Sequence, residues 1–481
     1  MSRKNLKNLF DKAKKIAYNY ESFINIDRGY DAMLITFTVS NFGSFDQPER
    51  FTMEAGRTRN FTNRTLRVGN TRLLKFKAIY GANASGKSNL IKAIDYMQRS
   101  VLHGPPSSSA TDYCRIKEKN VDRSSMFEIE LLLGETRYIY GFEIILSSGQ
   151  FIREWLNEKK GLKVKKVFER DVKGGTYDVT SYIHNSVLEE RLRIYADDVK
   201  QDGSILFLRV MNQNKESLYG EDSSIKVYRM LYQWFRHKLS VNYPDEPITR
   251  YNYFFDSQGS AAAIELLAKM DTGISNVHVY DESIEKVMAQ FSKKFGQELL
   301  DSLSEQKRHN DEKGIMEKPA VMIRSLEGHA MYIIELDGEE ITCKTLKFTH
   351  KYGSALFSLD EESDGTIRLL DLLEVLLSTS TDMVYVIDEV SRCLHPLLTK
   401  RFVQDFLSKA IERNVQLIVT THEATLLDLE LLRQDEIGFV GRRDVDGTSK
   451  LFGLEAFGAR FDKRIRKAYL DGQYGAVPEF K

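Results

Sequence analysis

The sequence has little proline, almost no cysteine and no excess of either charge. Its 481 residues include only 8 prolines, which argues against long disordered stretches. Lysine plus arginine (69) equals aspartate plus glutamate (69), which excludes a globally basic nucleic-acid coat and an acidic tail protein but not a local basic groove.

Cysteine use and hydropathy indicate the compartment. Cys114, Cys343 and Cys393 are odd in number, far apart and without a CxxC pair, so they predict neither a disulfide framework nor a zinc site. No apolar run approaches the ~18–20 residues that span a bilayer, and the basic N-terminus has no apolar signal region. We therefore expect a soluble, cytoplasmic protein in a reducing compartment.

The length is about three times the ~150 residues of an ordinary domain, so more than one folded unit is expected. After residue 350 helical and strand-like segments alternate, which indicates a parallel sheet with crossover helices. The expected helices are 368–377 and 397–412, and the expected strands are 383–387 and 416–420. Strands are also expected at 33–39, 76–80, 126–133, 137–146 and in 320–349, and helices at 88–101, 223–239, 261–270 and 282–307.

The fold class predicted is α/β, a P-loop NTPase whose mixed sheet with crossover helices is split by a long α+β insertion. The expected parts are a helical N-terminal extension (1–30), an N-terminal ATPase half (31–150), the insertion (151–345) and a C-terminal ATPase half (346–481).

A phosphate-binding motif follows the strand 76–80. Gly81-Ala-Asn-Ala-Ser-Gly-Lys-Ser88 fits G-x-x-x-x-G-K-[ST] without a mismatch and precedes a helical segment. Glycines let backbone N–H groups surround phosphate oxygens, Lys87 would reach the β- and γ-phosphates, and Ser88 would join the Mg²⁺ shell. The residues expected to bind nucleotide here are Gly81, Asn83, Ala84, Ser85, Gly86, Lys87, Ser88 and Asn89.

Two further strands end in polar groups. The strand 383–387 ends in Asp388 and Glu389, where the first carboxylate would hold Mg²⁺ and the second would act as general base on the attacking water. The strand 416–420 leads to His422, which would sense the γ-phosphate as a neutral donor. The plain alternatives are a turn cap for the carboxylates and a surface histidine.

Ser363-Asp-Gly-Thr366 opens the helix expected near residue 368. A serine and a glycine at a helix start can form a second anion site, but on this evidence alone an ordinary N-cap is the better explanation.

These motifs, in this order, resemble the ATP-binding-cassette type of P-loop ATPase, in the branch of the SMC, RecF and OLD proteins. The segments 362–371, 386–389 and 394–398 are especially similar to the ATPase subunits of bacterial anti-phage abortive-infection systems of the AbiLi/RloA-like group. The resemblance covers roughly 31–150 and 346–481. Asp364 departs from the cassette pattern, which has a small residue there, and Gln98 and Gln150 are the candidates for the Q-loop glutamine.

The resemblance implies that Ser363 and Gly365 contact the γ-phosphate bound to a second subunit. The cofactors implied are ATP and Mg²⁺, with Glu389, His422 and Lys87 as catalytic residues and Ser88 and Asp388 as metal ligands. The implied partners are a second copy of the chain across an ATP sandwich and a separate toxin or nuclease effector. Nucleic acid is a further candidate partner, and no membrane is expected.

Three weaker patterns have simpler explanations. The R-x₄-H spacing from Arg324 to His329 lies between two strand-like runs and indicates a hairpin turn. Asp444-Val-Asp-Gly447 indicates a solvated hairpin, since too few residues follow His422 for a nuclease domain of ~100 residues. The lysine-rich run 159–166 is typical of a charged strand or turn, with nucleic-acid binding as the alternative.

Two functions follow as hypotheses. In the first, ATP drives self-association of an anti-phage ATPase that controls a separate effector. In the second, a RecF/SMC-like repair ATPase uses ATP to clamp DNA, against which the neutral charge weighs mildly. A self-contained nuclease of the OLD type is disfavoured because its catalytic domain is missing.

Overall fold

The fold is described from a computed structural model, which describes residues 32–58, 60–179, 182–183, 186–215, 218–219, 225–244, 252–254, 257–313, 318–324, 330–378, 380–457 and 465–474. The chain forms two compact units, one of residues 30–246 with 379–481 and one whose described part is within 247–378. The helix expected within residues 1–30 lies outside the described residues.

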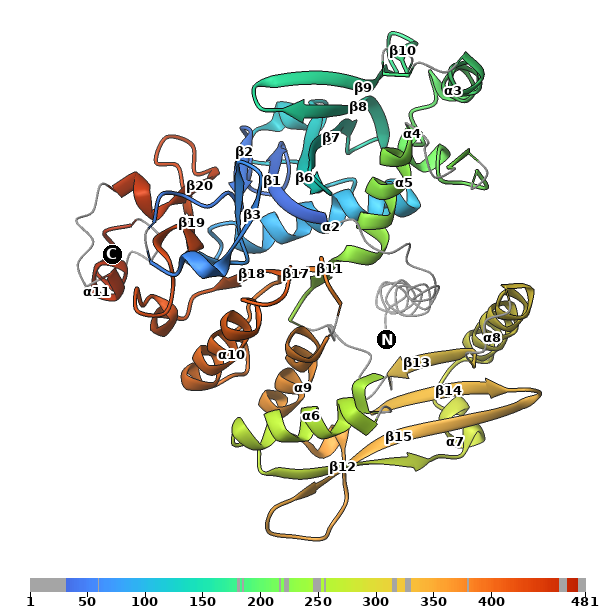
Figure 1. The fold of residues 1–481 in the computed structure, drawn as a ribbon, viewed down its shortest axis with the longest axis vertical. Helices are drawn as coiled ribbons and strands as arrows, with labels where there is room; N and C mark the ends of the chain where they lie inside the picture. The colour runs from blue at the N-terminus through green and yellow to red at the C-terminus, as the bar shows by residue number, and fades with distance from the viewer. Residues whose placement is uncertain are drawn as a thin grey trace. The chain divides into compact units, whose positions relative to one another are not determined.

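A six-stranded sheet forms the base of the first unit (Figure 1). Its first five strands run parallel, and the last pairs antiparallel with its neighbour. In sheet order the strands are β11 (Leu239–Asn242), β17 (Val384–Ile387), β18 (Gln416–Thr421), β5 (Phe76–Tyr80), β19 (Ile437–Arg442) and β20 (Ser449–Gly453). The predicted parallel sheet is confirmed. Because parallel strands present their carboxyl ends at one edge, the polar residues after β5, β17 and β18 meet there.

Two long helices belong to this sheet. The helix α2 (Lys87–His103) follows β5, and α10 (Pro396–Lys409) connects β17 to β18. The helix α10 begins at a proline, whose missing N–H costs nothing in a first turn, and His395 caps it by accepting a hydrogen bond from Leu397 N. The predicted helices 88–101 and 397–412 are confirmed within a few residues.

A seven-stranded antiparallel sheet forms the second layer of this unit. In sheet order its strands are β10 (Thr176–Asp178), β9 (Lys163–Asp171), β8 (Gln150–Lys160), β7 (Thr136–Ile145), β6 (Ser125–Leu133), β1 (Ala32–Ser40) and β2 (Glu49–Thr52). The boundary expected at residue 151 therefore falls inside one continuous sheet, within β8. The hairpin expected from 126–133 and 137–146 is the β6–β7 pair.

Smaller elements complete this unit. They are β3 (Thr65–Val68), β4 (Thr71–Leu74), α3 (Ser186–Val199), α4 (Phe207–Val210), α5 (Lys226–Gln233), a π-helical turn η6 (Trp234–Lys238) and α11 (Ile465–Leu470). The helix expected at 223–239 is thus α5 with η6. The sequence did not predict the strand β11 that follows, because a four-residue strand shows too little periodicity.

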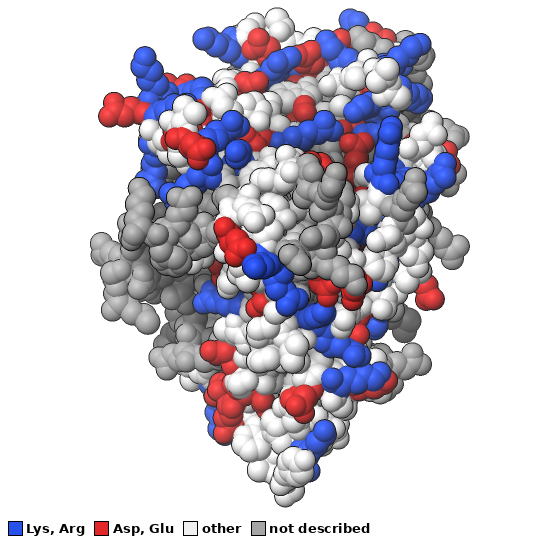
Figure 2. All heavy atoms as spheres, turned by 90° about the vertical axis from the view of Figure 1, so that its left-hand side faces the viewer, with Lys and Arg blue, Asp and Glu red and all other residues white. Residues whose placement is uncertain are grey.

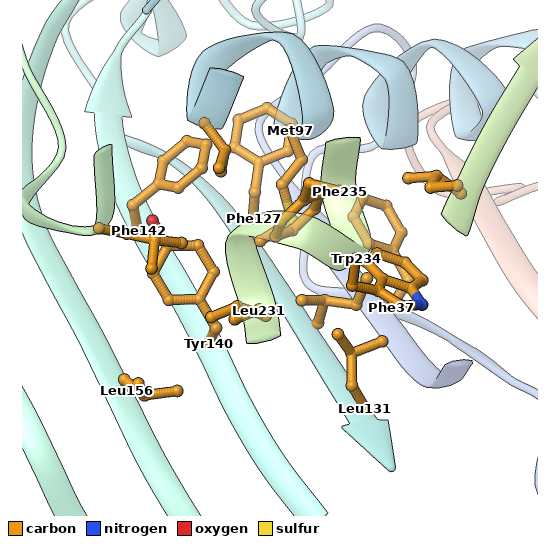
Figure 3. Packing of buried hydrophobic residues seen from close by; sticks show 14 of the residues in the cluster. Phe37, Met97, Phe127, Leu131, Tyr140, Phe142, Leu156, Leu231, Trp234 and Phe235 are labelled. Carbon is orange, nitrogen blue, oxygen red and sulfur yellow. The ribbon is translucent and has the colours of Figure 1, made fainter. Parts of the chain in front are cut away.

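The helix α2 is buried between the two sheets. Buried residues cover most of its circumference, as expected for a helix packed on both sides. Figure 3 shows Met97 of this helix among Phe127 of β6, Phe142 of β7 and Phe235 of η6. The start of α2, where the phosphate-binding motif lies, is therefore held by the core of the unit.

The second unit contains a five-stranded sheet and four helices among its described residues. Its strands are β12 (Ile274–Asp281), β15 (Glu340–His350), β14 (Met331–Asp337) and β13 (Ala320–Arg324) in sheet order, with β16 (Phe357–Ser358) paired to β15. Its helices are α6 (Ser257–Lys269), α7 (Ile284–Met288), α8 (Lys293–Lys313) and α9 (Asp364–Leu377). The helix expected at 282–307 is therefore divided into two.

No helix in the described part of the chain is long and apolar enough to cross a bilayer. The three cysteines are free thiols, of which Cys114 and Cys343 are buried and Cys393 is exposed.

Candidate functional site

The phosphate-binding motif forms a loop between β5 and α2. Ala84 has a φ of 59° and Gly86 a φ of 113°, so the backbone turns through left-handed conformations before the helix begins at Lys87. Backbone N–H groups in such a turn converge on one point and form an anion-binding nest. The two left-handed residues are consistent with an anion-binding turn.

Lys87 lies over this loop. Its side chain is buried, and Nζ donates to the carbonyl oxygens of Gly81 (2.7 Å) and Ala82 (3.1 Å). Burial lowers the pKa of Lys87, while the charges of Asp388 and Glu389 act in the opposite direction. These charges reach Lys87 because β17 ends at the same sheet edge as β5. The structure therefore brings the lysine and the two carboxylates, distant in sequence, into one site.

A threonine joins the two carboxylate residues. Thr420 Oγ1 donates to Asp388 Oδ1 at 2.5 Å and accepts from Glu389 N–H at 2.8 Å. Asp388 is buried, and its backbone N–H donates to the carbonyl of Asn242 at the end of β11 (2.9 Å). Its position is thus fixed by both neighbouring strands.

Glu389 has a left-handed backbone, with a φ of 48°. A non-glycine residue in this region costs about 1–3 kcal/mol and persists only where its surroundings hold it. Here the hydrogen bond from Glu389 N–H to Thr420 and the bond from Val390 N to Thr420 O (3.1 Å) hold it. The side chain is half-buried, so water can reach it.

His422 follows the end of β18. Thr421 is in register with Tyr80, the last residue of β5, so His422 comes next to the start of the phosphate-binding loop. Its side chain is exposed, and Thr421 Oγ1 lies 3.1 Å from Ser391 Oγ in the segment after Glu389. The strand register therefore groups the expected histidine with the loop and the carboxylates.

Ser363 and Gly365 lie in the second unit. Ser363 is exposed and caps α9, with its Oγ accepting from Thr366 N at 3.1 Å. The N-cap that the sequence offered as the plain explanation is present. The contact with a γ-phosphate on another chain stays a prediction.

The donor set near the loop fits a magnesium ion held in part by substrate. Mg²⁺ in nucleotide sites takes one or two carboxylates and hydroxyls, with phosphates and waters completing its octahedron. Ser88, in the first turn of α2, and Asp388 would supply one hydroxyl and one carboxylate. Among the described residues no group of three or more His, Cys, Asp and Glu side chains could hold a metal by itself.

The sequence did not identify Thr420 or Asn242 as residues of the site, and it left Gln98 and Gln150 as alternative candidates for the Q-loop glutamine. Gln98 donates to the carbonyls of Phe235 (2.7 Å) and Leu239 (2.8 Å), so it fixes α2 to the turn before β11. Gln150 lies at the start of β8. A useful signal was the run of two threonines before His422, since a hydroxyl at a strand end can reach the neighbouring strand.

The weaker patterns have structural explanations. Residues 325–329 lie outside the described residues, but β13 and β14 on either side pair antiparallel, as a hairpin requires. Asp446 accepts hydrogen bonds from Thr448 N and Oγ1 and pairs with Lys117, so the turn between β19 and β20 uses this carboxylate for structure. The run 159–166 forms the β8–β9 hairpin end.

Comparison with known proteins gives one family. Residues 76–428, well over half of the chain, match the family model described as "AAA domain, putative AbiEii toxin, Type IV TA system". No curated protein sequence is detectably similar to the chain.

Among solved structures, similar chains include SMC head domains. One is the SMC head bound to the C-winged helix domain of ScpA, with 14% identity, a TM-score of 0.39 and coverage of 88% of this chain and 98% of that one. Another is the SMC head of Thermotoga maritima, with 14% identity, a TM-score of 0.34 and coverage of 88% and 99%.

Proposed function

The chain belongs to the family described as "AAA domain, putative AbiEii toxin, Type IV TA system", and we therefore propose that it binds ATP with Mg²⁺ and hydrolyses it at the site around Lys87. The observation that carries this proposal is that Lys87 follows β5 and the Asp388–Glu389 pair follows β17 at the same edge of a parallel sheet. We also propose a cytoplasmic location, because ATP is an intracellular nucleotide.

Each residue has a distinct task in the proposed reaction. The backbone of the loop and Lys87 hold the phosphates, and Ser88 and Asp388 hold the metal. When bound, Mg²⁺ neutralises charge on the phosphate oxygens. Glu389 accepts a proton from the attacking water. His422 donates to the γ-phosphate from the β18 side.

Phosphate release from MgATP by the purified chain tests this proposal. We expect steady turnover by the wild-type chain, none above background by Lys87→Ala, and ATP binding with slow turnover by Glu389→Gln. Equal rates for all three would refute the assignment of the site.

We further propose that ATP joins two chains. Ser363 and Gly365 would contact the γ-phosphate held by the partner, and the exposure of Ser363 at the start of α9 supports such a contact. Light scattering of Glu389→Gln should show a dimer or larger assembly with ATP and the monomer without it.

The biological role we propose is control of a separate toxin or nuclease effector in a bacterial anti-phage abortive-infection system. The family description, which names a toxin of a type IV toxin–antitoxin system, supports this role. Infection of cells that carry the native operon tests it. Protection should be lost with Lys87→Ala, and the untagged neighbour gene product should copurify with the wild-type chain.

A second candidate function is ATP-dependent DNA clamping, which the β8–β9 hairpin favours. Lys160 and Lys163 are directly paired at its end, and Leu162 between them is fully exposed. Figure 2 shows Lys and Arg side chains, with some Asp and Glu among them, on the end of the unit that carries these strands. Tight DNA binding by the chain alone that requires ATP and falls steeply with salt would favour clamping over effector control.

A further inference from the structure

The hairpin β19–β20 lies against the phosphate-binding loop. Arg442 at the end of β19 donates from Nη2 to the carbonyl of Ala84 (3.0 Å), and Ser449 Oγ at the start of β20 lies 2.5 Å from the carbonyl oxygen of Ser85. A Cβ added to Gly81 would lie 2.5 Å from the backbone oxygen of Val440. Three residues of this hairpin, Arg442, Ser449 and Val440, therefore lie against the loop.

Position 86 needs a glycine for two reasons, its backbone angle and the close approach of the β19–β20 hairpin. Its φ of 113° disfavours any L side chain. A Cβ at this position would lie 2.6 Å from Ser44 Oγ and closer still to Ser449 Oγ, so two hydroxyl groups fill the space a side chain would need. The second consensus glycine thus lets Ser44 and Ser449 approach the loop.

Ser449 is held between Ser44 and the loop. Asn89 Nδ2 donates to Ser44 Oγ (2.8 Å), and the backbone N–H of Ser449 donates to the carbonyl of Ser44 (2.8 Å). Ser449 Oγ is the donor toward both Ser44 Oγ (2.6 Å) and the carbonyl of Ser85 (2.5 Å), so its one hydroxyl proton is shared between these two acceptors.

The hydrogen bond from Ser449 Oγ to the carbonyl of Ser85 sets the orientation of one peptide group. In a planar trans peptide the C=O of one residue and the N–H of the next point in opposite directions. Because the carbonyl of Ser85 points to Ser449, the N–H of Gly86 points away from Ser449. That N–H is one of the donors a phosphate needs.

We propose that Ser449, supported by Ser44, is a positioning residue that holds the Ser85–Gly86 peptide with its N–H directed at the bound phosphate. The C-terminal hairpin thereby completes a nucleotide site whose other residues precede it in the chain. The proposal rests on the proposed function, since it assigns a task at the same site.

The test uses the full chain and measures dissociation constants of MgATP and MgADP together with the free energy of unfolding without nucleotide. Ser449→Ala should weaken both nucleotides about tenfold, the effect of one lost hydrogen bond, and Ser449→Thr should restore the affinity. Ser44→Ala removes the competing acceptor and leaves the Ser449 proton to Ser85 O, so it should bind both nucleotides at least as tightly as the wild type. This variant remains usable if Ser449→Ala does not fold, and weaker binding by Ser44→Ala would contradict the proposal.

A matched control is Ser125→Ala. Ser125 is buried, and its hydroxyl donates to the backbone oxygen of Asn41 at 2.6 Å, which is the same kind of bond away from the loop. It should lose comparable stability and keep wild-type affinity. The proposal is overturned if Ser449→Ala binds like the wild type, or if Ser125→Ala weakens binding equally. A wild-type chain that binds no nucleotide would overturn the proposed function as well.

Discussion

Thr420 Oγ1 donates to Asp388 Oδ1 at 2.5 Å and accepts the backbone N–H of Glu389 at 2.8 Å. One hydroxyl on β18 therefore fixes both the carboxylate expected at the metal and the backbone of the residue expected to activate water. The two carboxylates have different surroundings. Asp388 is buried and hydrogen-bonded, whereas Glu389 is half-buried.

Thr420→Val should lower kcat about tenfold, because the isosteric side chain loses both hydrogen bonds and frees the orientation of Asp388 and Glu389. The KM for ATP should change less, since the phosphate-binding loop is untouched. Steady-state phosphate release measures both constants. The control is Thr345→Val, which removes a buried hydroxyl bonded to Met331 O in the second unit and should leave kcat unchanged. Equal kinetics for both variants would contradict the role given to Thr420.

Lys87→Ala should weaken MgATP binding by roughly a hundredfold, because a charged hydrogen bond to phosphate contributes about 1.5–3 kcal/mol. Titration of a fluorescent ATP analogue measures this change. Lys92→Ala is the matched control, since Lys92 is exposed on the same helix. If Lys87→Ala bound ATP as tightly as Lys92→Ala, the loop would not be the phosphate site.

Glu389→Gln should bind ATP normally but hydrolyse it about 10²–10⁴ times more slowly, because the amide cannot accept the proton of the attacking water. Single-turnover experiments separate this step from product release. The exposed Glu412→Gln should keep the wild-type rate. Full turnover by Glu389→Gln would assign the general base to another residue.

The parts of the site that the sequence predicted are local. Gly81, Gly86, Lys87 and Ser88 occur in one short run, because a phosphate needs a tight turn, a cation and a hydroxyl from adjacent residues. The strand that precedes them and the helix that follows were also predicted, because the hydrophobic pattern of a strand or helix is likewise a property of neighbouring residues.

The parts that the sequence missed depend on strand order and register. Thr420 reaches Asp388 only because β18 is hydrogen-bonded to β17, and Ser449 reaches Ser85 only because β19–β20 adds to the sheet beside β5. Neither contact has a local pattern. The expected boundary at residue 151 has a similar cause, because antiparallel strands of one sheet look alike whether or not a domain ends between them.

Ser363→Arg should leave ATP binding by a single chain intact and impair hydrolysis, because the proposed contact is with phosphate held by another chain. Ser363 is exposed, so the larger side chain does not disturb the core. Mixing Ser363→Arg with Lys87→Ala should recover part of the activity, since one of the two shared sites in a mixed dimer is intact. No recovery on mixing would argue against shared sites.

Glu436→Gln should remove a pH dependence of stability that burial creates. Burial raises the pKa of Glu436 to about 7 from an ordinary 4.5, although a hydrogen bond from Arg433 N–H acts in the opposite direction. The folded state therefore binds this proton more readily than the unfolded state, so the contribution of Glu436 to stability is fully present below pH 4.5 and is lost as pH rises through about 7. The loss is on the order of 3 kcal/mol for a shift of about 2.5 units. Urea unfolding measures the free energy of unfolding at pH 5 and pH 8. The free energy of Glu436→Gln relative to the wild type should be higher at pH 8 than at pH 5, while that of the exposed Glu412→Gln should equal the wild-type value at both. A constant difference between Glu436→Gln and the wild type at the two pH values would contradict a buried, protonated Glu436.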